Sequence, residues 1–390
     1  MCTLFNLGCK LNQYEGYCLQ KVLTNEAPVV IVNTCCVTAQ AEQKSRKKFH
    51  RVLKHYPDKK VVVTGCACIL HPEDYVQAHR IIDPVERTHL IANIFPKPPR
   101  SRYFLKIQDG CTEPCTYCIV SIIRNHLFSR PIADIIDEIR WAHKHAYKEV
   151  VMVGANIGLY GADTGTSLSQ LLSELKTIHD LPRIRLSSIE PRFITRSMID
   201  IMKDLPLCRH FHIPIQSGDD EVLSEMGRAY RNRELRERIH LLANVFPDCA
   251  IGCDIIVGFP GEGDDNFQNT GKLIDDLPIT HVHVFPYSPR PQTRAFRLGD
   301  PISLQMKKAR LWDLKRRVVK KNLQFRQRLI GHDLEVIIVQ SAPVCIGLSD
   351  NYIQLELDRS LDQGKLAKAR VVKVESSRTY GTVIRAEHSV

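Results

Sequence analysis

The sequence lacks any run of 18 or more apolar residues, which excludes a membrane-spanning helix. Its first residues, MCTLFNLGCKLNQYE, lack the basic, apolar and small-residue order of a secretory signal peptide. The chain also contains no internal repeat and no low-complexity tract, which excludes a repeat array. We therefore expect a cytoplasmic protein with no membrane partner.

The composition is that of a globular protein, with 44% hydrophobic and 25% charged residues. At 390 residues the chain exceeds the size at which one hydrophobic core stops growing, so two or three domains are expected. Lys and Arg outnumber Asp and Glu by 54 to 43, and this net charge of +11 favours a polyanionic partner such as nucleic acid. The alternative is a protein that is simply basic.

Fourteen cysteines are present without a secretory signal. A reducing cytosol keeps thiols free, so a disulfide framework is not expected in a chain of this size. Metal or cluster ligation is the leading explanation for so many cysteines.

The first part of the chain alternates short apolar runs with helical stretches. Strand-like runs near residues 3–7, 29–32 and 61–63 are separated by helices at about 13–24 and 41–53. This alternation predicts a parallel sheet with helices on its faces. The Pro-rich stretch FPKPPR cannot continue a helix or a central strand and is predicted to be a linker, so a first domain is expected at residues 1–96.

A second domain is predicted at residues 97–330. Six strand candidates alternate there with amphipathic helices, which predicts a partial (β/α)6 barrel of parallel strands with its site at their carboxyl ends. The six candidates lie at residues 104–107, 150–153, 183–187, 211–213, 251–256 and 281–285.

Residues 303–330 are predicted to form a long helix with ten Lys or Arg and one Asp. Such a charge run is often no more than a solvated face. The alternative is a surface for the phosphates of a nucleic acid, to which eight of these residues are suited: Lys307, Lys308, Arg310, Lys315, Arg316, Arg317, Lys320 and Lys321. Residues 331–390 then alternate in short runs separated by Gly, Asp and Ser, which predicts a small antiparallel β-barrel.

The most specific motif is Cys111, Cys115 and Cys118, in the segment GCTEPCTYC directly after a predicted strand. Three thiolates in a C-x3-C-x2-C loop can bind three irons of a 4Fe–4S cluster and leave the fourth iron open. A zinc site is the natural alternative, but structural zinc takes four ligands, and no fourth Cys or His follows at a suitable spacing.

This spacing, with Tyr117 before the last cysteine, resembles that of the radical S-adenosylmethionine superfamily. The resemblance implies that the open iron holds S-adenosylmethionine and that an electron from the cluster cleaves it to a 5′-deoxyadenosyl radical. It also assigns a set of cofactor-binding positions, although each one alone is no more than an ordinary turn or cap. These positions are Tyr117, Gly154, Asn156, Ser188, Glu190, Gln216 and Asp254.

Three further cysteines, Cys9, Cys35 and Cys66, stand at the ends of the predicted strands of the first domain. Thiolates at one edge of a parallel sheet can converge on one cluster. Taken alone, three such cysteines are more often small core residues. Cys36 and Cys68 lie beside the proposed ligands and could substitute for them.

The segments GCKLNQYE, NTC-x-VT with AEQKSR, and TGC resemble the methylthiotransferase family of radical S-adenosylmethionine enzymes. This resemblance covers essentially the whole chain and implies a second, auxiliary 4Fe–4S cluster held by Cys9, Cys35 and Cys66. It also implies a TRAM-like RNA-binding last domain and the consumption of two S-adenosylmethionine molecules. The details resemble the branch that converts N6-threonylcarbamoyladenosine, next to the anticodon of tRNA, to its 2-methylthio derivative.

The implied partners are tRNA and an electron donor such as flavodoxin or ferredoxin, whereas the sulfur source is not indicated. The enzymatic alternatives are methylthiolation of isopentenyladenosine in tRNA or of a ribosomal protein. The non-enzymatic alternative is an RNA-binding protein that keeps its clusters for structure or redox sensing.

Overall fold

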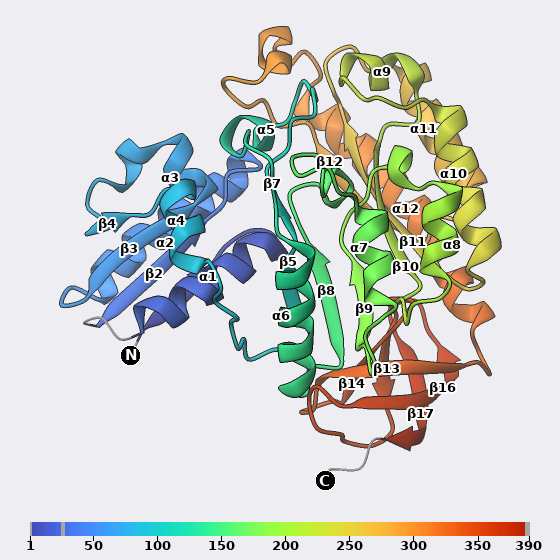
Figure 1. The fold of residues 1–390 in the computed structure, drawn as a ribbon. Coiled ribbons are helices and arrows are strands. Elements are labelled where there is room, and N and C mark those ends of the chain that lie inside the picture. Colours follow the sequence, from blue (N-terminus) through green and yellow to red (C-terminus); the bar gives the residue numbers. More distant parts are fainter. Residues whose placement is uncertain (1, 25–27, 387–390) are drawn as a thin grey trace.

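The computed structural model describes residues 2–24 and 28–386 and begins with a four-stranded parallel sheet in the order β1-β2-β3-β4 (Figure 1). Strands β2 and β3 are rich in Val and almost wholly buried, as expected for a sheet covered by helices on both faces. The predicted parallel sheet is therefore confirmed. Its elements are β1 (Thr3–Asn6), α1 (Lys10–Leu23), β2 (Val29–Thr34), α2 (Ala39–His55), β3 (Lys60–Gly65), α3 (Cys66–Leu70), β4 (Arg80–Ile81) and α4 (Pro84–Ile91).

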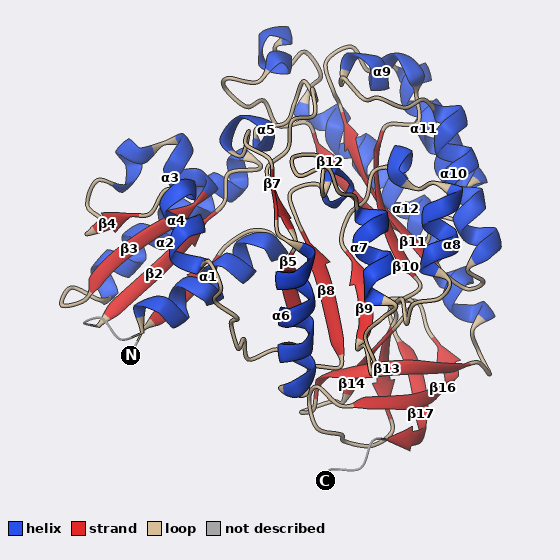
Figure 2. Ribbon diagram, in the orientation of Figure 1, coloured by secondary structure: helices blue, strands red, loops and turns tan. Residues whose placement is uncertain are grey.

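The central part holds two three-stranded parallel sheets, β5-β8-β9 and β10-β11-β12, with helices along their outer side (Figure 2). The two sheets are joined where Ile189 N–H donates to the carbonyl of His212 at 3.0 Å. The result is the predicted partial barrel of six parallel strands.

The elements of this barrel begin with β5 (Tyr103–Lys106), the short pair β6 (Gln108–Asp109) and β7 (Phe128–Ser129), and α5 (Val120–Ile123). The remaining strands are β8 (Glu149–Val153), β9 (Arg183–Leu186), β10 (His210–Gln216), β11 (Ala250–Val257) and β12 (His281–Pro286). The helices are α6 (Ile132–Lys144), α7 (Leu168–Leu175), α8 (Arg196–Met202), α9 (Asp220–Glu225), α10 (Asn232–Val245), α11 (Asp264–Asp276) and α12 (Leu304–Arg328).

Helix α1 joins the first sheet to the barrel. It lies between that sheet and β5 (Figure 1), and its apolar residues Leu11 and Leu19 share a core with Phe104 and Val151 of β5 and β8. Strand residues on the opposite side, such as Leu105 and Met152, pack against the outer helices. Side chains alternate between the two faces of a strand, so α1 covers the inner face of this part of the barrel.

The last part of the chain is a closed barrel in the order β13-β14-β15-β17-β16, which confirms the predicted small β-barrel. Its strands are β13 (Asp333–Gln340), β14 (Ile346–Ser349), β15 (Gln354–Leu357), β16 (Leu366–Val374) and β17 (Thr379–Ala386). The small barrel lies at the amino end of β9, where Arg183 donates to the Leu348 carbonyl at 3.0 Å and Arg185 to that of Ser349 at 3.1 Å.

The predicted boundaries at residues 96 and 330 fall between α4 and β5 and just beyond α12, and they stay a prediction. Within the described ranges, no helix is both long and apolar enough to cross a membrane.

The expectation that eight basic residues of α12 serve phosphates is corrected by the packing of that helix. Lys307 and Arg310 are buried, and Arg310 pairs with Glu262 and Asp264. Two others are also engaged, since Arg317 pairs with Asp275 and Asp313, and Lys321 donates to three carbonyls at the end of α11. The exposed members of the set are Lys308, Lys315, Arg316 and Lys320.

Adjacent lysines of α12 therefore differ in their contribution to stability. Lys307 donates to the Tyr287 carbonyl at 3.2 Å and pairs with Asp300, whereas its neighbour Lys308 is exposed. We expect Lys307→Met to lower the free energy of unfolding by roughly 1–3 kcal/mol, because it leaves a buried acceptor unpaired. Lys308→Met should stay within about 0.5 kcal/mol of wild type in urea unfolding. Equal stability of the two variants would contradict this assignment.

Candidate active site

Cys9, Cys35 and Cys66 lie at the carboxyl ends of β1, β2 and β3. Cys35 and Cys66 directly follow their strands, and Cys9 takes the N-cap position of α1. Gly8, with φ of +99°, crosses so close to Cys35 that a Cβ at Gly8 would lie 3.1 Å from the Cys35 sulfur. The parallel sheet therefore gathers these three thiols at one edge, where a second cluster was predicted.

Ser45 of α2 fixes the backbone at Cys35. Its hydroxyl accepts the Cys35 N–H and donates to the Cys35 carbonyl, both at 2.9 Å. Of the neighbouring thiols, Cys68 is turned to another partner, since it donates to the Gly65 carbonyl at 3.4 Å, whereas Cys36 hydrogen-bonds to the proposed ligand Cys66.

The loop with Cys111, Cys115 and Cys118 follows β6. Gly110, with φ of +79°, turns the chain so tightly that any Cβ would collide with the backbone at His126. The Cys111 N–H donates to the Arg124 carbonyl at 2.8 Å, and the Cys118 N–H donates to the Cys115 carbonyl at 3.3 Å. These hydrogen bonds hold the three cysteines within one compact loop.

Arg228, which lies just after the carboxyl end of α9, holds the middle of this loop. Its Nη1 donates to the Cys115 sulfur at 3.1 Å, and its Nη2 pairs with Glu190 at 3.0 Å. Glu190, a predicted cofactor-binding residue, therefore lies beside the cysteine loop. A guanidinium next to a thiolate stabilises its negative charge.

Gly154 and Asn156 are tied to the same region through Gln108. The side-chain Oε1 of Gln108 accepts the Asn156 N–H at 3.0 Å, and its Nε2 donates to the Gly110 carbonyl at 2.6 Å. A Cβ at Gly154 would lie 2.8 Å from Gln108, which explains the glycine. The loop after β8 is thereby fixed against the cysteine loop.

The remaining predicted positions are placed less uniformly. Tyr117 packs edge-to-face on Phe259, and Ser188 lies exposed after β9. Gln216 ends β10 with a left-handed φ of 69°. Asp254 lies further down the barrel, and both its oxygens are taken by His212 and His283.

Arg124 links the two groups of cysteines. Its backbone carbonyl holds Cys111, and its guanidinium donates to Asn12 at 3.0 Å and to Glu15 at 2.8 Å in α1. The same guanidinium and a hydrogen bond from Cys36 hold the pKa of Cys66 below its usual value, with the Cys36 bond the larger effect. Arg124 therefore touches the surroundings of both predicted clusters.

Glu15 is the centre of a buried charge cluster. It is fully buried and pairs with Arg124 at 2.8 Å, Lys106 at 2.7 Å and Arg87 at 3.3 Å. Asp109 completes the cluster by pairing with Lys106 and Arg124, both at 2.6 Å. Burial opposes ionisation of Glu15, but Arg124, Arg87 and Lys106 together lower its pKa to about 2.

The donor set fits iron–sulfur clusters. The six thiols are all free, and burial raises the pKa of Cys35 to about 11 and that of Cys111 to about 12, so a bound metal would have to displace their protons. Among the described residues, only His212, Asp254 and His283 approach closely enough to share a single metal ion. The wider spacing of both cysteine trios suits a cluster of several irons.

The sequence alone did not indicate the roles of Arg124, Arg228 and Gln108. Each is a single polar residue in or after a predicted strand or loop, and nothing in its neighbours distinguishes it from a solvated side chain. Arg228 lies in the segment MGRAYR, whose resemblance to the methylthiotransferase family is the one available signal.

Comparison with known proteins agrees with this geometry. The Radical SAM superfamily matches residues 105–274, and the Uncharacterized protein family UPF0004 matches residues 2–85. The threonylcarbamoyladenosine tRNA methylthiotransferase MtaB of Thermotoga maritima is 31% identical, covering 96% of this chain and 94% of that protein. The chain belongs to the radical S-adenosylmethionine methylthiotransferase family. Its central barrel is thus a radical S-adenosylmethionine domain, which implies a 4Fe–4S cluster and S-adenosylmethionine as cofactors.

The chain is also similar to a methylthiotransferase that is named for another substrate and to a solved structure that shares only the fold. The tRNA-2-methylthio-N(6)-dimethylallyladenosine synthase of Thermodesulfovibrio yellowstonii is 29% identical, over 97% of this chain and 94% of that protein. The radical S-adenosylmethionine methyltransferase TsrM of Kitasatospora setae shares the fold, with a TM-score of 0.55 and 15% identity over 72% of this chain and 68% of that one.

The charge cluster predicts a large effect of one substitution. Arg124→Met leaves Glu15 and Asp109 buried with fewer partners, and we expect it to lower the free energy of unfolding by about 3–5 kcal/mol. Arg51→Met on the exposed face of α2 is the matched control and should change it by less than about 0.5 kcal/mol. Urea unfolding of both variants measures the difference.

The same cluster predicts an acid dependence. The folded pKa of Glu15 is depressed to about 2 from 4.5, so its contribution to stability is complete above pH 4.5 and is lost as the pH falls towards 2. The Arg124→Met variant should lose less stability over this range than wild type. Identical acid profiles would contradict the role of Arg124.

Proposed function

We propose that this methylthiotransferase acts on N6-threonylcarbamoyladenosine in tRNA and adds a methylthio group at carbon 2 of the base. The observation that carries the proposal is the joining of the two cysteine trios through Arg124, because methylthiolation needs both a radical source and a sulfur donor within reach of one base. The threonylcarbamoyladenosine enzymes of Thermotoga maritima, Aquifex aeolicus, Rickettsia prowazekii and Chlamydia pneumoniae, at 29–32% identity, support this substrate.

Six cysteines would hold two 4Fe–4S clusters. Cys111, Cys115 and Cys118 suit the cluster that binds S-adenosylmethionine, and Cys9, Cys35 and Cys66 suit the auxiliary one. With S-adenosylmethionine, these clusters supply a radical able to take hydrogen from an unactivated carbon, together with the methylated sulfur. A side-chain base could not deprotonate that carbon at neutral pH.

The residues of the chain itself would bind and orient S-adenosylmethionine and shield it from water. Arg228 and Glu190 hold the loop at Cys115, and Gln108 fixes the Gly154–Asn156 turn against it. Ser188 and Gln216 stay candidates for contacts to S-adenosylmethionine, as does Tyr117, whose ring packs beside the loop. Asp254 is a weaker candidate for that role, because its carboxylate is already occupied by two histidines.

The tRNA would be held by the exposed cations of α12. Exposed Lys308, Lys315, Arg316 and Lys320 on α12 suit backbone phosphates, which give sequence-independent and salt-sensitive affinity. The base must leave the stack to reach a buried site, which is easier in an anticodon loop than in a duplex. The electron would come from a small redox protein such as flavodoxin or ferredoxin.

Replacing each cysteine trio separates the two roles. Anaerobically reconstituted wild type should hold about eight irons, and triple Cys→Ala replacement of either trio should remove about half. Loss of Cys111, Cys115 and Cys118 should abolish release of 5′-deoxyadenosine, whereas loss of the other trio should leave it measurable while methylthiolation stops. Cys36→Ala and Cys68→Ala are the matched controls and should keep full iron content. Equal loss of 5′-deoxyadenosine release from both trio variants would overturn these roles.

The substrate is tested in cells. In tRNA from a strain lacking this gene, nucleoside mass spectrometry should show 2-methylthio-N6-threonylcarbamoyladenosine absent and its precursor accumulated. Expression of the wild-type chain should restore the modified nucleoside, and the Cys111→Ala variant should not. Loss of the isopentenyl derivative instead, or unchanged tRNA nucleosides, would contradict the proposal.

A further inference from the structure

Lys10, the first residue of α1, directly follows Cys9 and carries a cation without a partner. Among the described residues, no hydrogen bond or ion pair reaches its ammonium group, although the side chain is half-buried. The nearby charges that act on it are those of Arg102, Arg185, Glu149 and the neighbouring Cys9 thiolate. An unpaired cation away from bulk water costs free energy, and an anionic ligand would offset that cost.

The negative charge near Lys10 is already taken. Glu149, fully buried, pairs with Arg185 at 2.7 Å, Arg183 at 2.7 Å and Arg102 at 3.6 Å. Its single charge is shared by three guanidinium groups, of which, among the residues described, only Arg183 has a second carboxylate, that of Glu335 at 3.4 Å, and the Nη1 of Arg102 still lacks a hydrogen bond. The inner face of the barrel below Cys9 therefore has an excess of positive charge.

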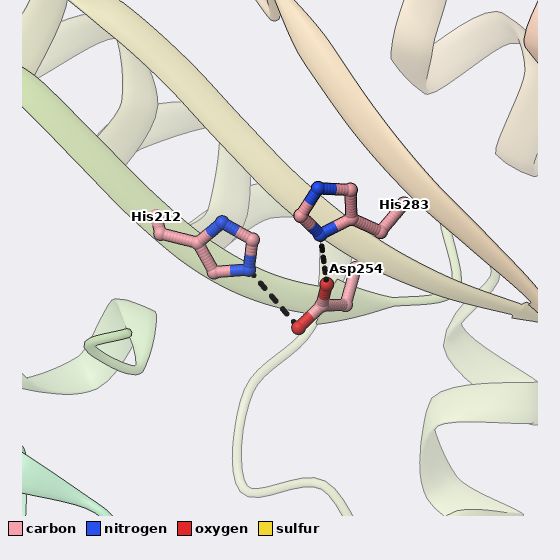
Figure 3. A group of neighbouring side chains, drawn as sticks. All are labelled: His212, Asp254 and His283. Atoms are coloured by element: carbon pink, nitrogen blue, oxygen red, sulfur yellow. Dashed lines mark hydrogen bonds and ion pairs between the residues drawn. The ribbon is translucent and has the colours of Figure 1, made fainter. Parts of the chain in front are cut away.

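Three side chains on neighbouring strands extend this face (Figure 3). Asp254 of β11 accepts from His212 of β10 at 3.0 Å and from Nδ1 of His283 of β12 at 3.2 Å. The alternate residues Ile213 and Cys253 pack in the core beneath the outer helices, so the three polar side chains point inward. The carboxylate fixes the ring of His283, which is 64% exposed and turns its other nitrogen away from Asp254.

Lys10 opens α1, the helix that packs on the inner face of the barrel at β5 and β8, and its charge is close enough to act on both His283 and His210 of that face. His210 lies one layer below His212, is 6% exposed, and has an Nδ1 atom without a hydrogen-bond partner. The region thus combines an unpaired ammonium, an exposed imidazole edge and an unsatisfied buried nitrogen.

A divalent cation is the obvious other occupant. The ligand atoms of His212, Asp254 and His283 lie within 4.8 Å of one another, as a metal site requires. However, Lys10 and Arg185 would repel a cation here, and the one carboxylate of the group already bonds two imidazoles. The excess positive charge favours an anion instead.

We propose that Lys10, supported by the exposed edge of His283, binds the carboxylate of the threonyl group on the substrate base. The proposal rests on the proposed function, since a threonine joined through its nitrogen to a carbamoyl group keeps a free carboxylate. An isopentenyl group has no such charge, so this contact selects between the two modified adenosines. Lys10 is adjacent to the proposed ligand Cys9, which brings the anchored base near the sulfur donor.

The test is binding of anticodon stem-loop RNA to the anaerobically reconstituted enzyme, followed by fluorescence anisotropy. One RNA carries N6-threonylcarbamoyladenosine and the other its methyl ester, which removes the charge and keeps the shape. Wild type should bind the acid roughly 10- to 100-fold more tightly than the ester, the range expected for hydrogen bonds to a charged group. Lys10→Met should bind the two RNAs equally, whereas Lys10→Arg should recover part of the preference.

Lys47→Met, on the exposed face of α2, removes the same charge elsewhere and should keep the full preference. Equal affinity of wild type for acid and ester, or an intact preference in Lys10→Met, would overturn the carboxylate site. Formation of methylthio product from the acid RNA is measured separately. Its absence in wild type would refute the proposed function, whereas product without discrimination refutes this inference alone.

Discussion

The carboxylate of Glu15 is the group on which the arrangement of the active site depends. It is fully buried, and a buried carboxylate stays ionised only where cations and hydrogen bonds surround it. The cations come from three separate elements: Arg87 from α4, Lys106 from β5, and Arg124 from the loop after α5. If the first sheet and the barrel separated, the ion pairs of Glu15 with Lys106 and Arg124 would break and leave these charges without partners.

A buried ion cluster adds little net stability, but it fixes the relative positions of the elements that carry its charges. Apolar contacts among α1, β5 and β8 are not directional, so they would tolerate a small shift of these elements. The hydrogen bonds of Arg124 to Glu15, Asn12 and Asp109 are directional and would be broken by such a shift. Because Arg124 also holds the Cys111 N–H, the position of one cysteine loop is set relative to the sheet edge that carries the other. Tyr14 of α1 connects the same two parts a second time, because its hydroxyl donates to Glu138 of α6 at 3.0 Å.

The same principle operates at the other end of the barrel. Glu149 orients Arg183 and Arg185, and these two guanidinium groups donate to carbonyls of the small β-barrel. Tyr352 of that barrel stacks on His210 with ring centroids 4.1 Å apart. The amino ends of the strands are thus closed by the last part of the chain, while the carboxyl ends carry the cysteine loop. Lys10, unlike Arg183 and Arg185, has no hydrogen bond or ion pair among the described residues.

The sequence by itself determined the order of elements, the parallel and antiparallel sheets, and both cysteine trios. Apolar alternation, prolines and C-x3-C-x2-C spacing act over a few residues, and such patterns can be recognised without tertiary contacts. Only the tertiary structure decided what the motif NQYE does: Asn12, Tyr14 and Glu15 face partners that lie 112, 124 and 109 residues away. It also decided that Lys307 is buried while Lys308 is exposed, and that β14 completes the small barrel. Which charges meet depends on how distant segments pack, and residue spacing along the chain carries no record of that.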